Sequence, residues 1–267
     1  MGQHMPLSLL YLFCYTIDAE QLQIIMLCLE LPGFTGVNMK YSFLLIFILA
    51  HLLGDFALQT DKITKIKSTS LKGVAIHAGL IVMVQALFLS IFGLQGALLG
   101  AACGIIHFFI DYVKEMIGKT LNVRFFYFIF DQMMHFSVII LFTLLFTPSY
   151  VLLPLNILYV KIAIIIIVLV FASNITAKML IRDLNVNIRK DTFFKKRERL
   201  IDAIVCSAVF SSMLLPLSVF LFPIAFVFYL YSRFMKFKFE YSFDISAIKY
   251  FVYIFISFAM LLFLKLG

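Results

Sequence analysis

Residues 41–60 read YSFLLIFILAHLLGDFALQT, an apolar run that is long enough to cross a membrane as one helix. A transmembrane helix needs about 20 mostly apolar residues to span the hydrocarbon core. Because further runs of this kind follow, the sequence predicts an all-α, polytopic transmembrane bundle of about seven to eight helices. The expected spans are 41–60, 72–93, 95–113, 126–147, 156–180, a hairpin over 200–234, and 246–265.

The composition also indicates an integral membrane protein. Of 267 residues, 63% are hydrophobic and 13% are charged, whereas about 25% of the residues of an average soluble protein are charged. The basic residues behind the net charge of +8 are spread over short connections. This distribution is typical of cytoplasmic loops beside anionic membrane lipids and not of a nucleic-acid-binding surface. The four cysteines share no close spacing, so neither a disulfide framework nor a thiolate metal site is expected.

Three regions are expected along the chain. Residues 1–38 contain apolar pieces too short to span a membrane and no secretory cleavage site. We interpret them as a leader or interfacial appendage upstream of an ordinary start at Met39. Residues 39–148 are expected to form a four-helix core. Residues 149–267 are expected to add accessory transmembrane helices with a basic cytoplasmic loop at 182–199.

Loop charges orient the predicted bundle. The connections after the first, third and fifth spans are rich in Lys and Arg, whereas the alternate connections carry no charge, so the positive-inside rule places the basic set in the cytoplasm. The stretch 200–234 would measure about 52 Å as one helix, against about 30 Å of hydrocarbon. Since it contains Pro216 and Pro223, we expect a hairpin with its turn near 216–223.

Histidines and aspartates recur together within the first four spans. Three histidines each have an aspartate four residues away, and side chains at that spacing share one face of a helix, about 5 to 6 Å apart. At 1.5 Å per residue, these pairs and the lone His77 all lie about 5 to 16 Å below the same cytoplasmic surface. We therefore expect four helices to direct them toward one point. The pairs are His51 with Asp55, His107 with Asp111, and His135 with Asp131.

This constellation predicts a divalent metal site. An aspartate inside a membrane costs about 2.5–3.5 kcal/mol, and the interiors of the four spans hold no Lys or Arg to neutralise it. Imidazole with carboxylate favours Zn, with Mn or Fe as alternatives, and the number of groups allows one or two ions. A proton relay or a structural polar network is the competing interpretation. The expected ligands are His51, Asp55, His77, His107, Asp111, Asp131 and His135, of which the three aspartates are also the candidate catalytic carboxylates.

Further polar residues flank the predicted site and are candidates for substrate binding. Those at the cytoplasmic mouth include lysines, which attract anionic substrates such as phosphate. As determinants of topology, the same lysines would need no substrate. The candidates are Gln59, Lys62, Lys65 and Gln132, with Lys67 also at the mouth.

Two other features concern packing and the second half of the chain. Gly96, Gly100 and Gly104 follow one another at a spacing of four and permit close approach of a neighbouring helix. In the second half, polar residues either line a cavity or form helix-to-helix hydrogen bonds. These residues are Asn174, Thr176, Lys178 and Asp202.

The segment from Met39 to about Phe146 resembles a bacterial membrane-protein family known as the domain of unknown function 3307 family. The resemblance lies in AHLLGDFALQ at 50–59, His77, HFFIDY at 107–112 and DQMMH at 131–135. It implies a bacterial cytoplasmic (inner) membrane protein that shares these residues. The family brings no established activity.

The leading functional hypothesis is a metal-dependent hydrolase that acts on a lipid, lipid-linked or phosphoester substrate. A bound ion would activate water for the attack, and no Ser or Cys nucleophile lies among the candidate residues. The alternatives are a metal-ion or proton transporter or channel, and a structural membrane subunit. The outer halves of the first four spans are almost wholly apolar, which favours a site open to one side only.

Overall fold

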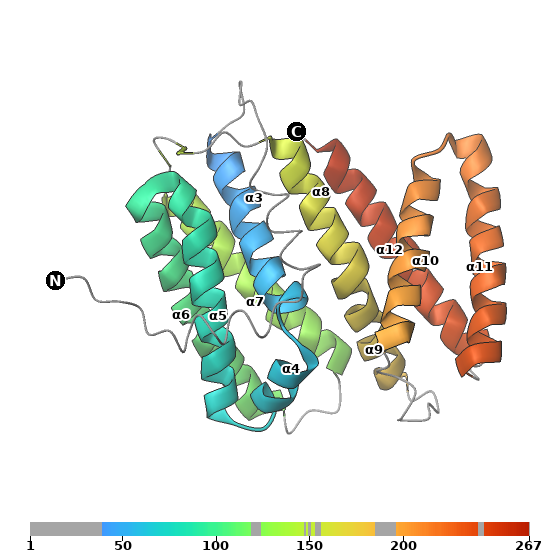
Figure 1. The fold of residues 1–267 in the computed structure, drawn as a ribbon, viewed down its shortest axis with the longest axis horizontal. Helices are drawn as coiled ribbons and strands as arrows, with labels where there is room; N and C mark the ends of the chain where they lie inside the picture. Colours follow the sequence, from blue (N-terminus) through green and yellow to red (C-terminus); the bar gives the residue numbers. More distant parts are fainter. Residues whose placement is uncertain are drawn as a thin grey trace. The chain divides into compact units, whose positions relative to one another are not determined.

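In the computed structural model of the chain, every regular element that is described is a helix (Figure 1). This confirms the predicted all-α class. The described residues are 39–118, 124–146, 148, 151–152, 156–184, 196–239 and 243–266. The expectations for residues 1–38 and for the middle of the basic loop, 185–195, lie outside them.

Among the residues that the structure describes, five helical stretches are long and apolar enough to cross a membrane, and they correspond to the expected spans other than the hairpin over 200–234. The second of them, Leu71–Met116, contains two of the expected spans and turns back at Gly93. The others are Met39–Ala57, Phe125–Leu145, Ile157–Asp183 and Phe243–Lys265.

The chain divides into two compact units, and the first comprises residues up to Glu115 together with His135–Ala163. The predicted metal ligands in this unit all lie on helices or on the turns that join them. Its described elements are α3 (Met39–Leu52), a π-helical turn (Leu53–Ala57), α4 (Asp61–Lys67), α5 (Leu71–Leu89), a 3-10 turn (Ser90–Phe92), α6 (Gly93–Gly118), the last part of α7 (Arg124–Leu145) and the first part of α8 (Ile157–Ile167).

Helix α3 lies at the core of the first unit. It is apolar around its whole circumference, as expected of a helix that is enclosed by other helices, and most of its residues are buried. At its N-terminal end, Phe43 packs against three other rings with centroid distances of 5.0 to 5.6 Å. These rings, which we call the aromatic cluster, are those of Phe43, Phe47, Phe92 and Phe146.

Helices α5 and α6 form a tight hairpin. Gly93 begins α6 with a φ of 80°, a backbone conformation that side chains with a Cβ rarely adopt. A Cβ at Gly100 would lie 2.5 Å from the carbonyl oxygen of Gln85, and one at Gly104 would lie 2.7 Å from Cα of Val82. The glycines therefore let the two helix backbones touch, which confirms the predicted close approach.

Helix α4 was not predicted from the sequence, where its residues are part of a basic connection. It is capped by Thr60, whose Oγ1 accepts a hydrogen bond from the backbone N–H of Ile63 at 3.3 Å. The next cap, Ser70, starts α5 by accepting from Gly73 N–H at 3.1 Å. A Cβ at Gly73 would collide with the backbone of Ile66 and Lys67, so this glycine lets α4 lie directly against α5.

The second unit comprises Met116–Met134 and Ile164–Gly267. Its core contains aliphatic and aromatic side chains from all of its later helices, among them Leu169, Val209, Met235 and Tyr253. After α8, its elements are a π-helical turn (Val168–Ala172), α9 (Ser173–Asp183), α10 (Lys196–Met213), α11 (Leu217–Phe239) and α12 (Phe243–Lys265).

The expected hairpin over 200–234 is formed by α10 and α11, which run side by side (Figure 1). Its turn lies at 214–216, earlier than expected, and is closed by hydrogen bonds from the N–H groups of Leu214 and Leu215. Pro216 therefore ends the turn, whereas Pro223 lies inside α11. As the seventh residue of α11, Pro223 removes one hydrogen bond from the helix, because only the first four N–H groups of a helix have no partner within it.

Candidate metal centre

A widened helical turn carries the first carboxylate of the predicted site. Asp55 lies in the π-helical segment Leu53–Ala57, which ends with a hydrogen bond from Leu58 N–H to Leu53 O of 2.8 Å. Such single π turns occur often at functional sites because the extra residue changes the direction of a side chain. The His51 Nε2 to Asp55 Oδ2 distance is 3.7 Å, so the predicted pair does face a common point.

Two imidazoles and two carboxylates from the π-helical turn, α5 and α6 converge in the first unit. Nε2 of His77 lies 3.0 Å from Asp55 Oδ1 and 3.5 Å from Asp111 Oδ2. Nε2 of His107 lies 3.3 Å from Asp55 Oδ1 and 3.0 Å from Asp111 Oδ2. The two nitrogens are 3.3 Å apart. All four side chains are buried, and none is more than 8% exposed.

The spacing of these four atoms fits the first coordination shell of a transition metal. With metal–ligand bonds of about 2.0 to 2.1 Å, two ligands of a tetrahedral ion lie about 3.3 to 3.4 Å apart. The five distances given above, four between a nitrogen and an oxygen and one between the two nitrogens, are 3.0 to 3.5 Å. Imidazole nitrogen with carboxylate oxygen is also a donor set of Zn, Mn and Fe sites. The residues therefore fit a divalent metal.

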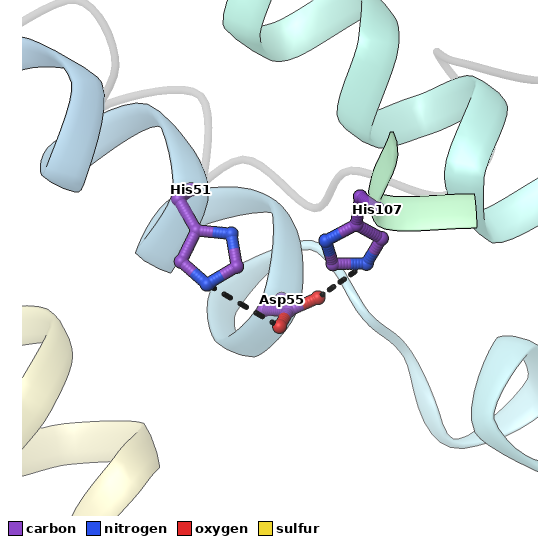
Figure 2. Close-up of side chains that lie close together, drawn as sticks. All are labelled: His51, Asp55 and His107. Carbon is purple, nitrogen blue, oxygen red and sulfur yellow. Dashed lines mark ion pairs between the residues drawn. The ribbon is translucent and has the colours of Figure 1, made fainter. Parts of the chain in front are cut away.

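A further histidine faces the second oxygen of each carboxylate. Nε2 of His51 approaches Asp55 Oδ2, and Figure 2 shows Asp55 between His51 and His107. Nε2 of His135 lies 4.0 Å from Asp111 Oδ1. The His135 ring stacks on His107 at 4.0 Å and lies 5.2 Å from His51, both between centroids. Each carboxylate thus presents one oxygen to His77 and His107. The other oxygen of Asp55 faces His51, and the other oxygen of Asp111 faces His135.

Asp131 and Gln132 lie one turn earlier on α7, within the second unit. Asp131 is 4% exposed, and its Oδ2 accepts a hydrogen bond of 3.3 Å from Nε2 of Gln132. The predicted spacing of Asp131 and His135 is thus retained on one continuous helix.

A lysine from outside the predicted spans reaches the converging side chains. Nζ of Lys67 on α4 lies 2.6 Å from Asp111 Oδ2. Lys67 is only 7% exposed. Lys62 and Lys65 on the same helix are exposed, and Gln59 donates to Thr64 Oγ1 at 3.2 Å. Of the expected residues at the mouth, Lys67 therefore reaches furthest into the centre.

The part of the chain that carries these residues matches a protein family. Residues 43–164 match the family "Protein of unknown function (DUF3307)". The DUF3307 match confirms the resemblance inferred from the sequence motifs, and all seven predicted ligands fall within it. No curated protein and no solved structure matches the chain.

A second buried polar cluster lies beyond the DUF3307 match, within the second unit. Nζ of Lys249 on α12 lies 2.8 Å from Glu198 Oε1 and 2.6 Å from Asp202 Oδ2, and all three side chains are completely buried. Asp202 also accepts hydrogen bonds from Asn174 Nδ2 at 2.5 Å and from the Tyr231 hydroxyl at 2.9 Å. Asn174 and Asp202 therefore form a helix-to-helix hydrogen bond, which was one of the two expectations for them.

Glu198 and Lys249 were not identified from the sequence. Lys249 stands as a lone cation in the apolar helix Phe243–Lys265, whose ends alone carry other charges. An isolated charge within an apolar span is a signal for a buried partner. The partner itself, 51 residues away, has no signature of its own in the local sequence.

Proposed function

We propose that the chain is a metal-dependent hydrolase of the bacterial cytoplasmic membrane, acting on a phosphoester or lipid-linked ester. The observation that carries the proposal is the convergence of two imidazole nitrogens and two carboxylate oxygens at 3.0 to 3.5 Å. Buried polar groups in apolar surroundings are costly unless they are paired. A divalent ion, with Zn as the first choice and Mn or Fe as alternatives, would pair all four.

Each residue has a specific role in this proposal. His77 and His107, with Asp55 Oδ1 and Asp111 Oδ2, would hold one ion. His51 and His135 face the other two oxygens and would hold a second ion together with Asp55 and Asp111.

The chemistry that a bound ion supplies is activation of water for attack on the ester. The chain itself would supply the base, for which Asp55 and Asp111 are the candidates. It would also exclude bulk water, since the converging residues are buried. Gln59, Lys62 and Lys65 are the proposed substrate-binding residues in the same unit.

The aromatic cluster favours an enzyme over the competing function, transport of a metal ion or of protons. Phe47 and Phe43 precede His51 by four and eight residues, which is about 6 and 12 Å along α3. Both are completely buried, and Phe43 contacts Phe92 and Phe146. A transported ion would need polar groups along this path, whereas α3 presents rings there.

Elemental analysis of the purified chain tests the metal site. We expect one or two equivalents of Zn, Mn or Fe in the wild type after extraction in mild detergent, and loss of most of it in His107→Ala. Tyr231→Phe is the matched control, because it removes a buried hydroxyl from the second cluster and leaves the centre intact. A wild type that contains no transition metal and takes up neither Zn nor Mn would refute the proposal.

Two assays on the metal-loaded protein separate the competing functions. The hydrolase is expected to cleave bis(4-nitrophenyl) phosphate or 4-nitrophenyl phosphate, and His107→Ala to abolish the cleavage. A transporter would instead move Zn into proteoliposomes that contain a fluorescent Zn indicator. A structural subunit would bind metal and show neither activity.

A further inference from the structure

The position of Lys67 is not explained by its predicted role in a basic connection between membrane spans. Its side chain leaves α4, which is held against α5 by the contact that Gly73 permits, and its ammonium reaches Asp111 Oδ2 at 2.6 Å. Since Asp111 Oδ2 is also one of the four converging atoms, Lys67 lies at the edge of the candidate metal centre.

The ammonium of Lys67 can serve more than one acceptor. Lysine has three N–H donors and no acceptor, and among the residues that the structure describes Asp111 is the ion-pair partner of Lys67. A long side chain is restricted when it is 7% exposed, so two donors are held near the centre with capacity for a further acceptor. An oxyanion with several oxygens would meet this need.

The net charge of the metal-loaded centre also favours an anionic ligand. Asp55, Asp111 and Lys67 together carry one net negative charge when the imidazoles are neutral. One divalent cation makes this group net positive, and a second makes it more so. Because a buried net charge is unfavourable without a counter-ion, the loaded centre is expected to attract an anion.

The exposed face of α4 adds a route for that anion. Lys62 and Lys65 lie on the same short helix and are exposed, so they raise the positive potential outside the centre. Positive groups arranged in this way increase the local concentration of anions. Lys62 and Lys65 would therefore raise the concentration of anions near the centre, and Lys67 would bind the anion.

We infer that Lys67 binds the oxyanion of a phosphate-type substrate at the metal centre, and that its ion pair with Asp111 is the substrate-free arrangement. The inference rests on the proposed metal-dependent function and names the substrate class for it. Phosphate can belong to a lipid headgroup or to a soluble compound, and both present the same oxygens to Lys67.

Calorimetric titration of the full chain with inorganic phosphate tests this inference, in detergent, with and without bound Zn. We expect the wild type to bind phosphate and K67M to bind it about 10- to 100-fold more weakly, as for a lost charge-assisted hydrogen bond. K67M should keep its Zn content by elemental analysis. K72M is the matched control, because Lys72 is an exposed lysine at the start of α5 that has no proposed role in binding, and it should change phosphate affinity less than about threefold.

K67R keeps the test informative if K67M fails to fold. It retains the positive charge and should bind phosphate more strongly than K67M. Equal phosphate affinity in K67M and the wild type, or no phosphate binding in either, would overturn the inference. Loss of Zn together with phosphate in folded K67M would do so as well, because Lys67 would then only orient Asp111. A wild type that binds phosphate through Lys67 but takes up no metal would support the Lys67 site and refute the hydrolase.

The source of the phosphate is decided in phosphatidylcholine nanodiscs with and without phosphatidic acid. A lipid substrate requires phosphatidic acid to compete with inorganic phosphate in the wild type and not in K67M. Unchanged phosphate binding would make the ligand a soluble phosphate compound.

Discussion

Replacing Gly100 by alanine should disturb the candidate metal centre from a distance. A Cβ at this position would lie 2.5 Å from the Gln85 carbonyl oxygen and 2.9 Å from Ala86 N. Ordinary contact begins at 3.4 Å, so the two backbones must separate by about 0.9 Å, and the neighbouring atoms cannot turn away as a side chain would. Overpacking of this kind costs about 1–3 kcal/mol, while alanine returns up to about 1 kcal/mol of helix propensity.

The displacement should also reach the ligands. His107 follows Gly100 by seven residues, which is about two turns on the same face of α6. Its Nε2 lies 3.3 Å from that of His77 on α5, a separation that suits two ligands of one ion. Widening of the hairpin by about 0.9 Å would exceed the tetrahedral spacing of about 3.3 to 3.4 Å. We therefore expect Gly100→Ala to weaken Zn binding at least about tenfold.

Gly79→Ala is the matched control on the same hairpin. It lies only two residues after His77, but a Cβ there meets nothing within 4 Å, so its stability should rise slightly or stay unchanged. Thermal unfolding followed by circular dichroism at 222 nm, with Zn titration on the same samples, measures both effects. Equal melting temperatures and equal Zn affinities in the two variants would refute the reasoning about the hairpin.

Three other predictions concern single contacts. His77→Ala should weaken Zn binding more than His51→Ala, because His77 lies within 3.5 Å of both carboxylates and His51 is 3.7 Å from one; competition with a fluorescent Zn chelator measures the two affinities. Lys249→Met should lower the unfolding free energy by about 3 kcal/mol or more, because it removes the buried cation that pairs with two buried carboxylates. Adding Asp202→Asn should recover part of that loss in chemical denaturation, and no recovery would argue against direct coupling. Gly73→Ala should force α4 away from α5 and raise proteolysis at Lys62 and Lys65, whereas Gly79→Ala should not.

The sequence predicts much of the first unit because its signals are local. Apolar runs of about 20 residues define the membrane helices, and the four-residue spacing of histidine and aspartate defines which side chains share a face. His77 has no such partner, and its place in the site follows from its depth beside Lys72 in the sequence. The four side chains whose atoms converge are among the seven that these signals identify.

Long-range pairing explains what the sequence does not reveal. Lys67 and Asp111 are 44 residues apart, and whether a lysine in a basic connection enters a site depends on how that connection folds. In this chain it folds into α4, through Thr60, Ser70 and Gly73. The ion pair of Lys249 with Glu198 likewise depends on the packing of α10 against α12.

The π-helical turn at Leu53–Ala57 makes the direction of Asp55 depend on a count of residues as well as on their chemistry. Each residue of a regular helix turns the chain by about 100°. A π turn contains one residue more than a turn of α-helix. If the same residues closed this turn as an ordinary helix, the chain after it would be rotated by about that angle relative to His51. The aspartate would remain in the sequence with its carboxylate aimed elsewhere, so straightening the turn would silence the centre without removing a ligand.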